Sequence, residues 1–191
     1  MDTKKGKTLL AVNIQPVAYG NFTTVILDRS IPYFFIDQEG FGNLSSTNAC
    51  IEPLIEEIEA RIEFYNVFNG KKKDLKKTVM LQVSITPGLS FWPNASDIFG
   101  PVLNQREMSK FMRGMKKNIL AIENGLAEFF GGVISFVDLY VSLGTTNPVI
   151  KLLVMPVDET GGLNLEKYLT DTMKSKLFKA CEHIFLELSG K

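Results

Sequence analysis

The stretch TVMLQVSI at residues 78–85 carries the clearest strand pattern in this sequence. Apolar residues occupy every second position: Val79, Leu81, Val83 and Ile85. The positions between them hold a more polar set: Met80, Gln82 and Ser84. A period of two with one more polar face is typical of a strand that packs against a core on one side. The other side is then expected to face water or a partner, as in a mostly antiparallel sheet.

Other elements are predicted on both sides of this strand. Further strands are expected over residues 8–14, 22–28, 31–37, 133–143 and 149–155, and amphipathic helices over residues 49–68, 105–130 and 164–188. The second helix has the most regular stripe, from Met108 to Phe129 in alternating steps of four and three. The order βββ-α-β-α-ββ-α predicts an α+β fold, a two-layer α/β sandwich with a mostly antiparallel sheet and helices packed on one face.

The length of 191 residues fits a single domain, residues 1–191. Within it we expect a flexible tail at residues 1–7 and a long ordered loop at residues 87–103, which contains three prolines. No apolar run approaches the length of a membrane span. Cys50 and Cys181 lie in apolar helical patterns without CxxC spacing, which is typical of buried thiols in a reducing compartment. These features predict a cytoplasmic protein, or one assembled into a particle inside the cell.

The charges balance, with 21 Lys+Arg and 21 Asp+Glu. A protein that binds a polyanion by bulk charge normally carries a positive excess. Nucleic acid is therefore not the expected partner, and neither is a membrane. Protein partners are favoured instead.

No catalytic constellation is recognisable. The one histidine, His183, is expected on the polar side of the last helix, away from Cys181, which excludes a dyad between them. One histidine and two scattered cysteines do not make a common zinc site, and no glycine-rich phosphate motif is present. We expect no catalytic residue, no metal and no cofactor.

Two helices carry complementary charge stripes at spacings of four and three. The acidic stripe is Glu52, Glu56, Glu59 and Glu63, and the basic stripe is Arg106, Lys110, Arg113 and Lys117. If the stripes of neighbouring subunits meet, the contact is head-to-tail and can close into a ring. The alternative is two solvated helix faces that keep the protein soluble.

Three further groups are candidate sites, each with a structural alternative. Phe91 and Trp92 either anchor a partner or fold back onto the core. The lysines of residues 71–77 contact phosphate or an acidic partner, or form a solvated connector. Phe136, Asp138 and Tyr140 share the polar face of a predicted strand, where they could line a ligand pocket; Asp138 could instead pair with Lys151.

These observations favour a non-catalytic structural or interaction subunit. It would form a homo-oligomer or dock into a larger assembly, such as a connector or adaptor of a multi-protein machine or of a phage or virus particle. The alternative is a small-molecule binding module, or a carboxylate-based enzyme, with its pocket near Asp138. Nucleic-acid binding through residues 71–77 and the basic stripe is a third hypothesis, which the zero net charge disfavours.

Overall fold

The computed structural model describes residues 10–27, 33–35, 51–88, 91, 105–142 and 149–188. At residues 33–35, 105–116 and 141–142 it describes the backbone but not the side chains. Within the described residues the strands form one antiparallel sheet in the order β1-β3-β5-β4-β2. The strands are β1 (Leu10–Ala18), β2 (Tyr33–Phe35), β3 (Thr78–Pro87), β4 (Phe136–Ser142) and β5 (Val149–Val154). The predicted α+β fold with a mostly antiparallel sheet is confirmed, and β3 contains the stretch from which it was inferred.

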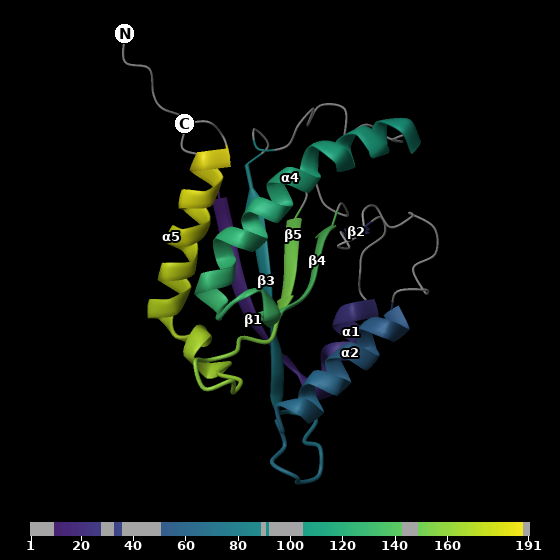
Figure 1. Cartoon of the computed structure of the whole chain (residues 1–191), viewed down its shortest axis with the longest axis vertical. Coiled ribbons are helices and arrows are strands. Elements are labelled where there is room, and N and C mark those ends of the chain that lie inside the picture. The colour runs from purple at the N-terminus through teal and green to yellow at the C-terminus, as the bar shows by residue number, and fades with distance from the viewer. Residues whose placement is uncertain are drawn as a thin grey trace.

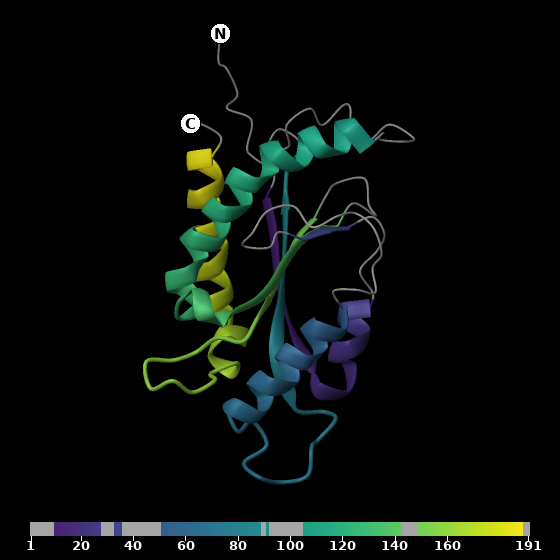
Figure 2. The same ribbon diagram turned by 45° about the vertical axis from the view of Figure 1, so that its right-hand side comes forward.

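Helices cover both faces of this sheet, which differs from the prediction that all pack on one face. The α-helices are α1 (Phe22–Leu27), α2 (Ile51–Phe64), α4 (Gln105–Phe130) and α5 (Asp171–Leu188). Figures 1 and 2 show α4 and α5 on one side of the sheet and α1 and α2 on the other. Residues such as Leu81 and Val83 pack toward α4 and α5, whereas Met80 and Leu153 pack toward α1 and α2. Both sides of β3 are therefore apolar at its beginning, near Met80, and only one side is apolar further along.

Residues 22–28 were predicted as a strand, but Phe22–Leu27 forms a helix. Phe22 and Ile26, four residues apart, are both buried against α2 and the sheet. The sequence FTTVIL is rich in β-branched residues, which favour strands locally. Burial of one helical face outweighs that local preference here.

The helix over residues 105–130 is confirmed with the predicted bounds. It stops at Gly131 and Gly132, whose φ angles of 90° and 103° lie in a region that favours glycine. The other two long helices are shorter than predicted, because residues 65–70 form turns and Glu166–Leu169 forms a 3-10 helix before α5. β4 likewise begins only after a 3-10 turn at Val133–Ser135.

Part of the predicted loop at residues 87–103 belongs to β3, which runs through Pro87. Phe91 is buried, with its ring centroid 4.6 Å from that of Phe185 on α5. The rest of that loop, including Trp92, and the predicted tail at residues 1–7 lie outside the described residues. In the part of the chain that is described, no helix has the length and apolar character needed to cross a membrane.

Candidate functional site

The segment between α2 and β3 is the most basic part of the described chain. We call residues 71–77 the lysine loop; its lysines, all exposed, are Lys71, Lys72, Lys73, Lys76 and Lys77. Five lysines and one acid, Asp74, give this loop a formal charge of +4. A local charge of this size is enough to attract an anion, whatever the net charge of the whole chain.

Backbone hydrogen bonds hold the lysine loop against the end of β1. The amide of Tyr19 donates to the carbonyl of Lys77 at 2.8 Å, and that of Gly20 donates to Leu75 at 2.9 Å. Asp74 accepts a hydrogen bond from the amide of Lys76 at 2.9 Å. These hydrogen bonds fix the backbone conformation of the loop, so its lysines project from defined positions.

Lys73 differs from the other lysines of the loop because it is paired. Its Nζ lies 2.7 Å from a carboxylate oxygen of Glu59 and 5.0 Å from the centroid of the Tyr19 ring. The hydrogen bond to Glu59, followed by that to Tyr19, raises the pKa of Lys73 above its ordinary value. Within the described part of the chain, none of the other four lysines forms an ion pair. Lys73 therefore attaches the loop to α2, and the remaining ammonium groups are available to a ligand.

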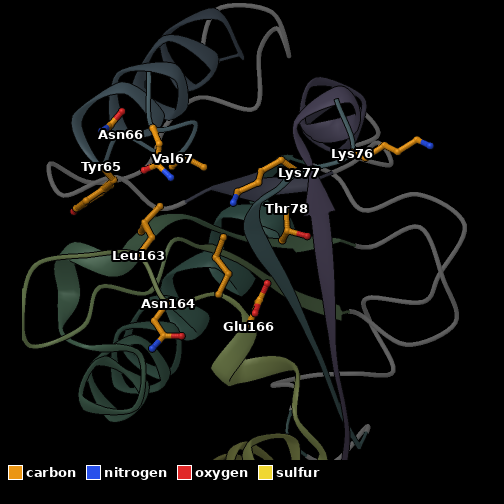
Figure 3. Close-up of a pocket in the computed structure, with 11 residues that line it drawn as sticks. Tyr65, Asn66, Val67, Lys76, Lys77, Thr78, Leu163, Asn164 and Glu166 are labelled. Carbon is orange, nitrogen blue, oxygen red and sulfur yellow. The ribbon is translucent and has the colours of Figure 1, made fainter. Parts of the chain in front are cut away.

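A pocket of about 550 Å³ adjoins this loop (Figure 3). Its walls come from the turn after α2, the start of β3 and residues 163–166. Figure 3 shows Lys77 extending toward Val67 and Leu163, while Lys76 points away from them. The polar lining consists of Tyr65, Asn66, Asn69, Lys76, Lys77, Thr78, Asn164 and Glu166. An ammonium, amides and a phenol ring together suit a ligand that has both an anionic group and an aromatic ring.

A second hollow, of about 480 Å³, lies beside Asp138, between α2, α4 and β4. It is lined by Phe136 and Asp138 but not by Tyr140, because the pairing of β4 with β5 shifts register between Phe136 and Asp138. Phe136 packs in the core under α4 and α5, and Tyr140 in the core under α1 and α2. The three residues predicted to share one face are therefore divided between two faces. Burial raises the pKa of Glu123, another lining residue.

The structure describes the side chains of the whole acidic stripe but of only one residue of the basic stripe. On α2, Glu52, Glu56 and Glu63 are exposed, whereas Glu59 is half-buried and holds Tyr19 and Lys73. Of the basic stripe on α4, only Lys117 has a described side chain, and it is exposed; the side chains of Arg106, Lys110 and Arg113 lie outside the description. A contact between the stripes of two subunits stays a prediction.

His183 and Cys181 do not meet. His183 is exposed on α5 with its Nδ1 3.6 Å from Glu187, and Cys181 is fully buried. Burial raises the pKa of the Cys181 thiol to about 12, so the thiol stays protonated at neutral pH. No group of three or more His, Cys, Asp or Glu that could hold a metal ion occurs among the residues that the structure describes.

Solved structures of the MobM relaxase domain share this fold. The MobM relaxase domain bound to a 26-nucleotide pMV158 oriT DNA superposes with a TM-score of 0.56 over 93% of this chain and 86% of that one, at 12% identity. A manganese-bound MobM relaxase domain with a 22-nucleotide oriT DNA, at pH 4.6, gives a TM-score of 0.57 with the same identity and coverage. In fold, this chain resembles a relaxase domain. No protein-family model matches the sequence, and no curated protein matches it either.

This likeness overturns the function predicted from the sequence. A non-catalytic assembly subunit that does not bind nucleic acid was expected, but the solved structures that share the fold are relaxase domains bound to DNA. The expectation was wrong because it rested on the net charge of the whole chain. In that sum the +4 charge of the lysine loop is cancelled by acids elsewhere, such as the exposed Glu52, Glu56 and Glu63.

The manganese of the MobM structures raises the question of whether this chain could hold such an ion. The whole sequence has one histidine, and it lies exposed on α5. Across residues 10–27, 33–35, 51–88, 91, 105–142 and 149–188, no cluster of three or more potential ligands forms. The described residues therefore do not fit a manganese centre.

Proposed function

We propose that this protein binds DNA, and that the lysine loop contacts the phosphate backbone. The observation that carries this is the fold, which matches DNA-bound relaxase domains over 93% of the chain. The lysine loop is the proposed contact surface because four of its exposed lysines form no ion pair within the described residues: Lys71, Lys72, Lys76 and Lys77. Ammonium groups that displace counterions from phosphates supply much of the affinity of proteins for DNA.

The adjoining pocket supports the same function. Lys77 extends into the region between the loop and residues 163–166, where it could bind a phosphate. Tyr65 offers a ring for stacking, and Asn66, Asn69 and Asn164 offer amides for hydrogen bonds to a base or sugar. Aromatic rings beside a basic groove are typical of proteins that bind single strands.

We also infer a cytoplasmic location, since the proposed ligand is DNA and Cys181 is a free buried thiol.

The first test compares two double charge reversals. Lys76→Glu with Lys77→Glu alters the loop, and Lys176→Glu with Lys179→Glu alters exposed lysines of α5 as a matched control. Because Lys76 and Lys77 are both proposed to contact phosphate, the loop variant should bind a fluorescein-labelled oligonucleotide at least about 30-fold more weakly. The measurement is fluorescence anisotropy at low salt. Equal weakening by both variants would show that the loop is not the contact surface.

A further inference from the structure

A row of polar side chains crosses the sheet on the face opposite α4 and α5. The strand pairing places Asn13 of β1 opposite Ser84 of β3, Ser84 opposite Lys151 of β5, and Lys151 opposite Tyr140 of β4. Residues directly opposite one another in an antiparallel sheet point to the same face. The row therefore joins side chains from four neighbouring strands, although they are far apart in sequence.

Asn13, Ser84 and Lys151 lie outside the core under α1 and α2, whereas Tyr140, at the end of the row, is buried in it. Met80 of β3 and Leu153 of β5, on the same face, are fully buried in the core under those helices. Further along β3, Ser84 is only half-buried, and Asn13 on β1 is exposed. Asn13 and Ser84 are thus accessible where the apolar covering ends.

Lys151 is the only lysine or arginine in the five described strands. It is half-buried, and its Nζ lies 5.9 Å from the centroid of the Tyr140 ring. The one acid of these strands, Asp138, pairs with Leu153 in the next row and lines the hollow beside α2 and α4. Lys151 lies beside Ser84, which in turn lies beside Asn13. An ammonium group, a hydroxyl and an amide in this order present hydrogen-bond donors suited to the oxygens of a phosphodiester.

We propose that Lys151, with Ser84 and Asn13, is a phosphodiester-binding site that works without a metal ion. This inference rests on the proposed DNA binding and adds a second contact, separate from the lysine loop. It also follows from the comparison with MobM, whose structures contain manganese, whereas the described residues of this chain form no metal cluster. On this sheet the positive charge that meets the DNA backbone is an ammonium group.

The test measures binding of a fluorescein-labelled mixed-sequence single strand to the full chain, in EDTA and in Mn²⁺. Lys151→Met should weaken binding about tenfold because it removes one charge-assisted contact. Lys151→Arg should stay within about threefold of wild type because the charge is kept. Lys179→Met on α5 is the matched control and should bind like wild type. Wild-type affinity should be the same, within about twofold, in EDTA and in Mn²⁺.

Thermal unfolding of each variant checks that it folds. If Lys151→Met does not fold, Ser84→Ala replaces it and should weaken binding about threefold. Full affinity of Lys151→Met or Ser84→Ala, or wild-type binding that requires Mn²⁺, would overturn this inference. If the loop variant loses affinity while the Lys151 variants do not, only the sheet site is wrong. If the wild-type protein binds no DNA, the proposed function fails as well.

Discussion

Ser135 connects the end of α4 to the segment that follows β5. Its side chain is fully buried; the hydroxyl donates to the carbonyl of Phe130 at 2.6 Å and accepts from the amide of Val157 at 3.0 Å. Ser135→Ala leaves both groups buried without this partner, which should lower the free energy of unfolding by about 2–4 kcal/mol. Urea denaturation measures the change, with Ser175→Ala on the exposed side of α5 as the control. A loss no larger than that of the control would contradict the structural role.

Gly131, at the end of α4, packs against the chain after β5 without room for a side chain. A Cβ at this position would collide with the carbonyl oxygen of Val157. Gly132 has a similar φ angle, but nothing lies within 4 Å of the Cβ it would gain. Both substitutions to alanine should cost about 1–3 kcal/mol in backbone strain. Gly131→Ala should cost at least about 2 kcal/mol more because of the collision. Equal melting temperatures of the two variants would contradict this.

Among the elements, those with a regular pattern were predictable from the sequence. The stripe from Met108 to Phe129 predicted α4 with its observed bounds, and the alternation at residues 78–85 predicted β3. Residues 22–27 were mistaken for a strand because six residues are too short to show helical periodicity. The second helical layer was missed because Met80 counted as part of the more polar face, whereas it is fully buried under α1 and α2.

The candidate sites depend on strand register, ion pairing and strand order, which the pattern of residue types does not predict. Alternation placed Phe136 and Tyr140 on one face, but the register shift in β4 separates them. That shift arises from pairing with β5, a long-range contact. The lysine loop was recognised in the sequence as a possible phosphate contact. What could not be predicted is that Lys73 is paired with Glu59 while its neighbours are not. The polar row around Lys151 likewise requires the strand order.

At the scale of the whole molecule, the segregation of charge matters more than its sum. Lys+Arg and Asp+Glu are equal in number, but the lysine loop carries +4. At an ionic strength of 0.1 M, charges more than about 10 Å apart are largely screened from one another. A phosphate bound at the loop therefore interacts mainly with charges in and near the loop, which include Glu59, the partner of Lys73.

The chain shares its fold with the MobM relaxase domain at only 12% identity. One architecture can be built from different sets of core residues of similar size, so a shared fold leaves surface and sheet side chains free to differ. Function has to be argued from those side chains and not from the fold alone. Here they are lysines, amides and a serine, which we propose to be the groups that contact phosphate.

The salt dependence of DNA affinity tests the proposed function most directly. Anisotropy titrations of the wild-type protein with a single strand, in EDTA and at several salt concentrations, give the slope of log K against log[salt]. Each neutralised phosphate of a single strand contributes about −0.7, so contacts from four loop lysines and Lys151 predict a slope between about −2 and −4. Absence of binding at low salt, or a slope near zero, would contradict DNA binding by this protein.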